Sequence, residues 1–190
     1  MARDPDLARP SAAMLLILDL DETLIHAAKG PPPRPADFVV GAYSVWKRPH
    51  LDAFLTSCAG WATPAFWSSA TDAYVRHVVD AILPAGLAPA FAWGRGRCTR
   101  RQDPETREDV LLKDLAKVRR RGFDLRRTLI VDDTPGKVAR HYGNAVYVPP
   151  YFGDPDDDVL PRLADYLATL RDAADVRVLE KRGWLPAGRG

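Results

Sequence analysis

The sequence is poor in several features that mark particular protein classes. It contains only two cysteines, Cys58 and Cys98, among 190 residues, which is too few for a disulfide framework and typical of a reducing compartment. Its 27 basic and 25 acidic residues give a formal net charge of +2. A charge so close to balance argues against general binding to polyanions.

Long hydrophobic runs are also missing. The apolar run at residues 12–18 is interrupted by Asp19, whereas a membrane-spanning helix needs about 20 apolar residues. Residues 1–10 carry acidic side chains and lack the layout of a signal peptide. We therefore expect a soluble, cytoplasmic protein that is a monomer and has no membrane partner.

What the sequence does contain is an alternation of strand-like and helix-like segments. Short apolar runs bounded by turn residues predict five strands, and longer segments with apolar residues at helical spacing predict helices. The predicted strands are residues 14–20, 63–69, 87–94, 127–133 and 144–150. The predicted helices are residues 49–59, 71–86, 107–122 and 156–176, the second of them capped by Thr71.

This alternation predicts an α/β fold with a mostly parallel, five-stranded sheet flanked by helices. The length and the globular composition, 46% hydrophobic and 27% charged, indicate one domain over residues 1–190. We expect its core at about residues 12–172 and a C-terminal tail at about 173–190. Residues 28–47 combine a proline-rich break with a β-hairpin that turns near Gly41, and we expect them to form a small flap.

Acidic side chains follow two of the predicted strands. Asp19 and Asp21 end the first, and Asp132 and Asp133 end the fourth. The carboxyl ends of parallel strands lie at one edge of a sheet, where α/β proteins bind ligands. Crowded carboxylates carry a desolvation cost unless a positive charge meets them. The sequence therefore predicts a cation at this edge, provided that the two strands are neighbours.

Hydroxyl and ammonium groups accompany these acids. Ser68 and Ser69 close the second predicted strand, and Lys113 lies on the helix predicted before the fourth. Acids that hold a metal, together with hydroxyls and a lysine, are suited to binding and transferring a phosphate.

The order of these motifs resembles that of the haloacid dehalogenase (HAD) superfamily. "DLDETL" resembles the first motif, DxDx[TV], "FWSSA" the second, and "LLKDL" with "LIVDD" the third and fourth. More narrowly, "LDLDETLIHA", "KRPHLDAFL", "WSSATDAYVRHVVD" and "KDL…LIVDDTP" resemble the carboxy-terminal-domain phosphatases, also called NLI-interacting-factor-like. The similarity extends from about residue 14 to residue 170, and it implies a Rossmann-like HAD fold without a large cap domain.

The resemblance also implies a phosphatase with an aspartyl-phosphate intermediate. Asp19 would be the nucleophile, and Asp21 would protonate the leaving oxygen and then activate water. Lys113 would neutralise the charge of nucleophile and phosphate. On the phosphate-binding side, Ser68 would donate a hydrogen bond to a phosphate oxygen, and Thr23 would support the loop between the acids.

The implied cofactor is Mg²⁺, which takes oxygen ligands and shares a substrate phosphate. Asp19, the backbone carbonyl of Asp21 and Asp133 would hold it, with Asp132 assisting. Many relatives carry Asp-Asn where this chain has Asp132-Asp133, so the local negative charge is higher here.

Simpler interpretations exist for single residues. An acid after a strand is often only a helix cap, and a lone lysine on a helix is usually solvated. The four motifs in consistent order favour a functional interpretation for Asp19, Asp21 and Lys113. Between the two serines, alignment on Tyr74 favours Ser68 over Ser69.

Several functions are compatible with this pattern. The family-implied substrate is phosphoserine or phosphothreonine in a protein. A nucleic-acid end phosphatase is an alternative because residues 94–127 hold twelve basic and six acidic residues, and a small-molecule phosphatase is another. A non-catalytic binding module would not require the acids Asp19, Asp21 and Asp132, nor would it require Ser68 and Lys113. A response-regulator receiver would have its acid pair first and its lysine last, the reverse of this chain.

Overall fold

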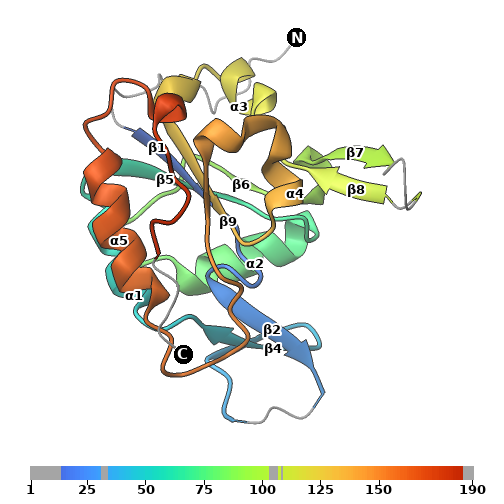
Figure 1. Cartoon of the computed structure of the whole chain (residues 1–190). Helices are drawn as coiled ribbons and strands as arrows, with labels where there is room; N and C mark the ends of the chain where they lie inside the picture. Colours follow the sequence, from blue (N-terminus) through green and yellow to red (C-terminus); the bar gives the residue numbers. More distant parts are fainter. Residues whose placement is uncertain (1–13, 31–33, 103–106, 108, 186–190) are drawn as a thin grey trace.

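A computed structural model of the protein describes residues 14–30, 34–102, 107 and 109–185. Its centre is a five-stranded sheet in the order β10-β9-β1-β5-β6, and every pairing in it is parallel (Figure 1). The strands are β1 (Met14–Leu18), β5 (Ala62–Trp67), β6 (Ala92–Trp93), β9 (Thr128–Asp132) and β10 (Ala145–Tyr147). The predicted fold class is therefore confirmed.

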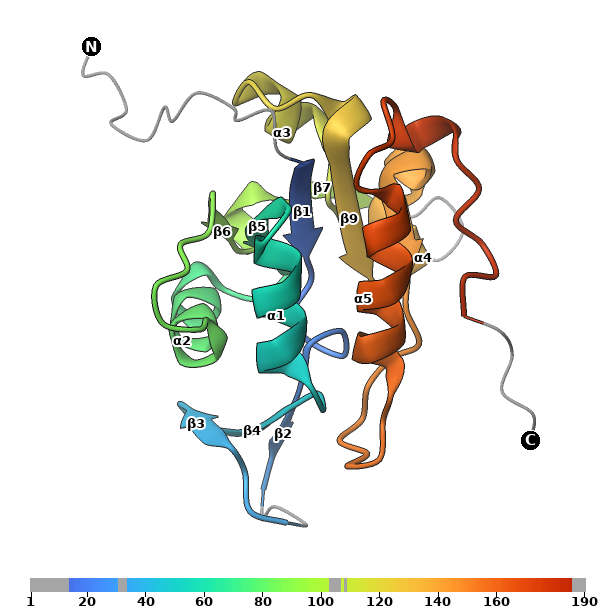
Figure 2. The ribbon, with the colours of Figure 1, turned by 90° about the vertical axis from the view of Figure 1, so that its left-hand side faces the viewer.

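Strand β1 is buried along its whole length because both faces of the sheet are covered. Leu16 and Leu18 pack into one core with α1 (Leu51–Ala59), α2 (Asp72–Ile82) and α5 (Val159–Leu170). Leu15 and Ile17 pack into a second core with α3 (Ala116–Arg120) and α4 (Pro135–Val138). In Figure 2, α1 and α5 lie side by side in front of the sheet.

The register of the central strands sets the position of the acids. Leu18 of β1 lies opposite Val131 of β9 and Phe66 of β5, and the Asp19 amide donates to the Val131 carbonyl at 3.0 Å. The strands that carry the two acid pairs are thus direct neighbours and end at the same edge of the sheet.

The predicted flap is a small antiparallel sheet at this edge. It contains β2 (Ile25–Lys29), β3 (Phe38–Val40) and β4 (Tyr43–Lys47) in the order β2-β4-β3. The hairpin between β3 and β4 includes Gly41 at φ 60°, a left-handed conformation that glycine adopts without steric cost. The hairpin is confirmed, and β2 adds a third strand that the sequence analysis missed.

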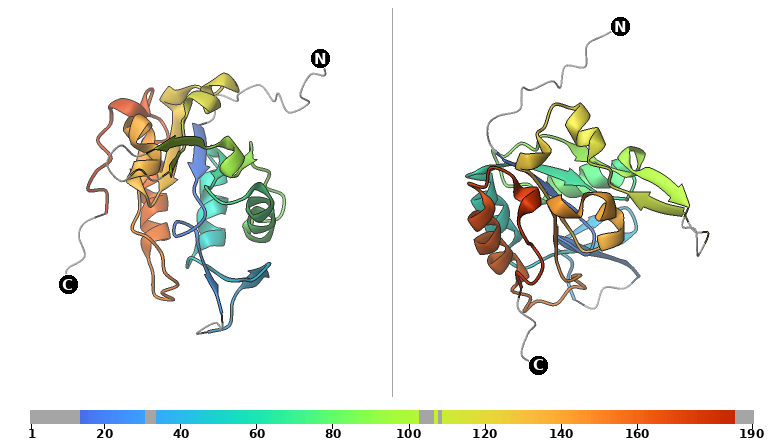
Figure 3. Two further views of the ribbon diagram at one scale, coloured as in Figure 1. Left: turned by 90° about the vertical axis from the view of Figure 1, so that its right-hand side faces the viewer. Right: turned by 45° about the horizontal axis from the view of Figure 1, so that its top comes forward.

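The helix predicted at residues 107–122 is wrong. Its first part is strand β8 (Asp109–Leu112), which pairs antiparallel with β7 (Thr99–Gln102), and only α3 is helical. This β7–β8 hairpin projects from the body of the molecule (Figures 1 and 3). The apolar run Val110, Leu111, Leu112 fits the residue spacing of a helix as well as that of a strand. Pairing with β7 makes it a strand. Lys113 consequently follows a strand and does not lie on a helix.

The segment after α5 packs back onto the body, and Val176 in η4 (Val176–Val178) is fully buried. The other 3-10 turns are η1 (Arg95–Arg97), η2 (Leu125–Arg127) and η3 (Ala139–Asn144). Within the described ranges, no helix is both long and apolar enough to cross a membrane. Parts of the predicted core, flap, basic stretch and tail (residues 12–13, 31–33, 103–106 with 108, and 186–190) lie outside the described residues.

Candidate active site

The site begins with Asp19, the first residue after β1. Its side chain is 1% exposed, and burial of a carboxylate requires compensation. Lys113 Nζ lies 2.7 Å from its Oδ1, and Lys137 Nζ lies 3.5 Å from its Oδ2. Two ammonium groups therefore hold the carboxylate from two sides.

Lys113 joins Asp19 to the end of the neighbouring strand. Its buried ammonium donates to Asp132 Oδ2 at 2.6 Å, and its backbone amide donates to the Lys137 carbonyl at 2.7 Å. Burial, followed by the negative charge of Asp19, raises the pKa of Asp132. The three carboxylates of Asp19, Asp132 and Asp133 also outnumber the two nearby ammonium groups of Lys113 and Lys137.

The arrangement of three carboxylates fits a divalent cation. Asp19, Asp132 and Asp133 each offer an oxygen, and these oxygens lie within 4.8 Å of one another. Hard cations such as Mg²⁺ prefer this donor set. Of the four acids predicted as metal ligands, the structure groups these three. The sequence predicts Asp21 as a ligand through its backbone carbonyl, and its carboxylate faces Tyr74 and Ser68.

Asp21 is held by two hydroxyl groups. Tyr74 donates to its Oδ1 at 2.8 Å and Ser68 to its Oδ2 at 3.0 Å. Burial, and to a smaller extent the charge of Asp19, raises the pKa of Asp21 above its ordinary value of 3.8. A carboxyl group with a raised pKa is suited to proton transfer. Asp19 and Asp21 thus have different environments although they are two residues apart.

The remaining predicted residues lie at this site as well. Ser68 is buried at the end of β5 and reaches Asp21, whereas Ser69 presents its carbonyl to Arg95 Nε at 3.0 Å. Thr23 is fully buried, and among the described residues its hydroxyl has no hydrogen-bond partner. Its carbonyl accepts a hydrogen bond from Arg48 at 3.0 Å.

Sequence reasoning missed three residues of the site: Glu22, Tyr74 and Lys137. Burial, followed by the charge of Asp21, raises the pKa of Glu22 from 4.5 to about 7. Tyr74 lies in the first turn of α2, next to the serine pair, and this placement was available from the predicted cap at Thr71. Lys137 lies on α4, which has only four residues. Such a short helix has no periodicity that would have placed the lysine.

Several known proteins are similar in sequence to most of this chain. A family model described as NLI interacting factor-like phosphatase matches residues 14–177. The CTD nuclear envelope phosphatase 1 homolog of Caenorhabditis elegans is 30% identical over 183 residues, which cover 88% of this chain and 71% of that protein. CTD nuclear envelope phosphatase 1B of Danio rerio is 31% identical with the same coverage. Nuclear envelope morphology protein 1 of Schizosaccharomyces pombe is 28% identical, over 86% of this chain and 34% of that protein.

Solved structures of Fcp1, an RNA polymerase II CTD phosphatase, share the fold. The structure of fission yeast Fcp1-R271A bound to beryllium fluoride has a TM-score of 0.54 and 19% identity, over 83% of this chain and 50% of that chain. A second Fcp1 structure has a TM-score of 0.56 at the same identity, over 83% of this chain and 49% of that chain.

The prediction of a cytoplasmic location is wrong. The relatives from C. elegans, D. rerio and S. pombe are all named for the nuclear envelope. The prediction depended on the low cysteine content together with the lack of a long apolar run and of a signal-peptide layout, and nuclear proteins share a reducing environment with the cytosol. Cysteine content therefore could not separate the two locations.

Proposed function

The chain belongs to the family of NLI interacting factor-like phosphatases, and on this premise we propose that it dephosphorylates phosphoserine or phosphothreonine in proteins, with Asp19 as the nucleophile. As a member of this family it is a phosphoric monoester hydrolase. The observation that carries the proposal is the buried carboxylate of Asp19, held by Lys113 and Lys137 beside Asp132 and Asp133.

In the first step, an Asp19 carboxylate oxygen forms a bond to phosphorus while the bond from phosphorus to the substrate oxygen breaks. Asp21 gives its proton to that departing oxygen, which leaves as an alcohol. In the second step, Asp21 takes a proton from a water molecule, whose oxygen attacks phosphorus and releases Asp19 and inorganic phosphate. Because the pKa of Asp21 is raised, the proton is available to the leaving group at a higher pH than in an ordinary aspartic acid.

The other residues hold the reactants. Lys113 and Lys137 place positive charge beside Asp19 and offset the negative charge of the phosphate. Tyr74 and Ser68 fix the direction of the Asp21 carboxyl group before substrate binds. Ser68 has a single O–H, which would turn to a phosphate oxygen when the substrate is bound. Thr23 supports the loop that carries Asp21.

The family relatives and the acid cluster imply a divalent metal, and we propose Mg²⁺. Asp19, Asp132 and Asp133 would hold it, with the backbone carbonyl of Asp21. When bound, it would withdraw negative charge from the phosphoryl oxygens and hold the phosphate against Asp19.

The dispersal of the basic stretch supports a protein substrate over a nucleic acid. Lys113 is buried in the site, Arg97 lies 5.3 Å from the ring of Trp93, and Arg126 pairs with Asp124 at 2.8 Å. These three groups are engaged with partners inside the protein and are therefore less available to a phosphate backbone. The names of the relatives, which are CTD phosphatases, support the same choice.

The proposal is tested with a substrate panel and a trapping experiment. Purified protein is incubated with phosphoserine and phosphothreonine peptides, sugar phosphates, and oligonucleotides that carry a 5′- or 3′-phosphate. We expect hydrolysis of the peptides. With ³²P-labelled peptide and rapid acid quenching, we expect label on the protein that hydroxylamine removes, as an acyl phosphate requires. The label should be missing in Asp19→Asn. Hydrolysis of oligonucleotide ends alone would reject the proposed substrate, and label that persists in Asp19→Asn would reject the nucleophile.

A further inference from the structure

The Lys137 segment, residues 134–144, has little helical structure that could hold it in place. It consists mainly of α4, which has four residues, and of η3, in which the backbone leaves helical geometry at His141 (φ −133°, ψ 36°). A single helical turn does not persist by itself, because its few hydrogen bonds do not offset the entropy lost in ordering the backbone. The position of Lys137 therefore depends on contacts between this segment and the rest of the protein.

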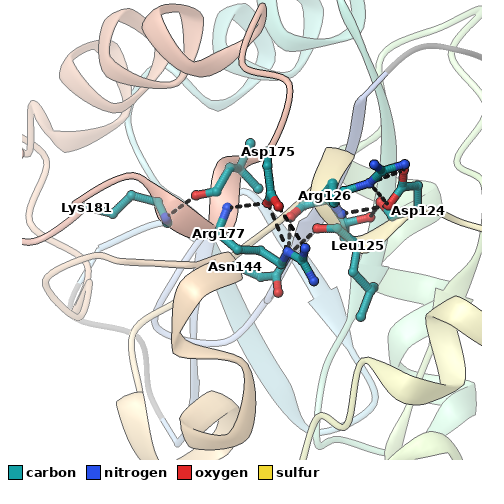
Figure 4. Close-up of polar contacts among 9 residues, drawn as sticks. Asp124, Leu125, Arg126, Asn144, Asp175, Arg177 and Lys181 are labelled. Atoms are coloured by element: carbon teal, nitrogen blue, oxygen red, sulfur yellow. Dashed lines mark hydrogen bonds and ion pairs between the residues drawn. The ribbon is translucent and has the colours of Figure 1, made fainter.

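Polar contacts hold the Lys137 segment at both ends. At its start, the Thr134 backbone amide donates to Asp132 Oδ1 at 2.9 Å. At its end, Asn144 Nδ2 donates to the Leu125 carbonyl at 2.6 Å (Figure 4) and to the Thr128 carbonyl at 2.7 Å. The lysine lies between these two anchors, so its own position depends on how the middle of the segment is held.

In the middle of the segment, contacts reach the two residues that follow β8. The Lys113 backbone amide donates to the Lys137 carbonyl at 2.7 Å, and His141 Nε2 lies 3.0 Å from Asp114 Oδ1. An ionised carboxylate only accepts hydrogen bonds, so Nε2 is the donor in this contact. Arg140 Nη1 adds a longer contact of 3.8 Å to Asp114 Oδ2. Asp114 thus holds the segment directly beside the point where the Lys113 backbone holds it.

Asp114 is suited to be the fixed half of this contact. Its Oδ1 also accepts a hydrogen bond from the Ala116 backbone amide at 3.0 Å, at the start of α3. Burial raises the pKa of Asp114, but the hydrogen bonds from His141 and the Ala116 amide, with the nearby charges, more than offset this, and the pKa lies below its ordinary value of 3.8. The carboxylate is therefore ionised at neutral pH and available as an acceptor.

The two lysines beside Asp19 differ in how firmly their ammonium groups are held. Lys113 is buried and lies 2.7 Å from Asp19 and 2.6 Å from Asp132. The side chain of Lys137 is 23% exposed and lies farther from its carboxylates, 3.5 Å from Asp19 Oδ2 and 3.9 Å from Asp133 Oδ1. Short contacts at the site fix Lys113, whereas the position of Lys137 depends more on its backbone.

We propose that Asp114 and His141 are positioning residues of the reaction, because their contact sets where the Lys137 ammonium lies relative to Asp19 and to the phosphate. This inference rests on the proposed function, in which Lys137 offsets the charge of the phosphate that Asp19 attacks. The pair acts on the reaction through Lys137 and not by contact with the substrate.

The test compares His141→Leu with His141→Gln. Leu removes the donor, whereas the amide of Gln donates from a position near that of Nε2. We expect His141→Leu to lower kcat for an aryl phosphate by on the order of tenfold, since a misplacement of about 1 Å can cost up to roughly 10²-fold. Inhibition by inorganic phosphate should also weaken. His141→Gln should recover most of both properties.

A double-mutant cycle distinguishes positioning from a purely structural role. Lys137→Met removes the ammonium that the pair positions, so His141→Leu should lower kcat no further in a Lys137→Met background. The loss of thermal stability caused by His141→Leu should be the same in both backgrounds. Asp114→Asn, which keeps the size of the side chain and removes its charge, should show the same dependence on Lys137.

Arg127→Met is the control for loss of stability alone. Arg127 Nη1 donates to the Ala173 carbonyl at 2.6 Å, and the residue directly precedes β9, at the end of that strand opposite to Asp132. We expect Arg127→Met to lower the unfolding temperature and to leave kcat unchanged.

The outcomes separate this inference from the proposed function. If His141→Leu keeps the wild-type kcat, or lowers kcat equally with and without Lys137, the pair is not a positioning pair and the proposed function stands. A His141→Gln variant as slow as His141→Leu overturns the inference as well. If the wild-type protein hydrolyses the aryl phosphate but no phosphopeptide, the proposed substrate fails, and the cycle with the aryl phosphate still decides the role of the pair.

Discussion

Among the described residues, Arg48 and Lys113 are both 1% exposed, but they lie in opposite circumstances. Arg48, at the end of the flap sheet, pairs with both carboxylate oxygens of Asp157 at 2.7 and 2.8 Å and also donates to the carbonyls of Thr23 and Pro149. Lys113 meets two carboxylates, Asp19 and Asp132, at 2.7 and 2.6 Å. The first cation has one acid and neutral acceptors, and the second has an excess of acids.

This difference separates a structural ion pair from one at the candidate active site. The guanidinium of Arg48 balances one carboxylate and finds acceptors for its remaining N–H groups, as a stable buried ion pair requires. Around Lys113, burial and then the charge of Asp19 raise the pKa of Asp132, so an ionised Asp132 carries a cost in the folded protein. Such costs concentrate at functional sites, where activity and stability make opposite demands.

The clusters around Lys113 and Arg48 are best distinguished by making the same substitution, Asp to Asn, at one acid of each cluster. Asp19→Asn should lower turnover of an aryl phosphate by on the order of 10⁶, as loss of a nucleophile does elsewhere. It should not lower the unfolding temperature in a chelator, because one of the crowded charges is removed. The matched variant Asp157→Asn should show the opposite pattern, with lower stability and retained chemistry. A clearly destabilised Asp19→Asn would contradict the comparison.

Within the functional centre, Asp21→Asn should cost roughly 10² to 10⁴ in turnover, since it removes general acid–base help. The loss should be larger for alkyl phosphates than for aryl phosphates, because an alkoxide needs its proton more. Steady-state rates for a series of leaving groups measure this. Equal losses across the series would show that Asp21 does not protonate the leaving oxygen.

At the structural centre, Arg48→Met should lower the free energy of unfolding by about 3–5 kcal/mol, because Asp157 is left without its partner. The neighbouring Lys47 provides the control, since it forms an exposed pair with Asp52 at 3.1 Å. Lys47→Met should change stability by less than about 1 kcal/mol. Urea unfolding of both variants gives the comparison, and equal effects would mean that burial does not distinguish these ion pairs.

A metal titration tests whether a divalent cation balances the surplus carboxylates around Lys113. A chelator should abolish hydrolysis and Mg²⁺ should restore it. Asp133→Ala should raise the Mg²⁺ concentration for half-maximal activity by on the order of tenfold or more, as loss of support at a metal site does. Asp157→Asn should leave this concentration unchanged. An unaltered Mg²⁺ titration for Asp133→Ala would remove Asp133 from the metal site.

The smallest expected effect is in the pH dependence of stability without metal. The folded-state pKa of Glu22 is raised from 4.5 to about 7, so the folded protein binds more protons than the unfolded chain between these values. Stability should therefore fall as the pH rises from about 4.5 to 7. Glu22→Gln should show a shallower fall over this window in chemical denaturation. If the two proteins have parallel profiles, Glu22 does not titrate differently in the folded state.

Part of the site could be predicted from the sequence because strand ends are local signals. The acids after residues 18 and 131 placed two carboxylate pairs at one sheet edge, and the register of β1 and β9 bears this out. The helix predicted at 107–122 failed because the pairing of Val110 with Arg101 competes with helical spacing. The ion pair of Arg48 could not be predicted from the sequence because its partner, Asp157, is 109 residues away. Long-range pairing of charges leaves no trace in local periodicity.

Strand β1 packs into two separate hydrophobic cores, one on each face of the sheet. Leu16 and Leu18 belong to one core, and Leu15 and Ile17 belong to the other. Asp19 follows the end of this strand, and its amide donates a hydrogen bond to the Val131 carbonyl. Because both cores pack against the strand, the carboxylate of Asp19 is supported from two sides of the sheet. Support from two cores lets their residues change while the proposed nucleophile stays in place, in keeping with a fold shared with Fcp1 at 19% identity.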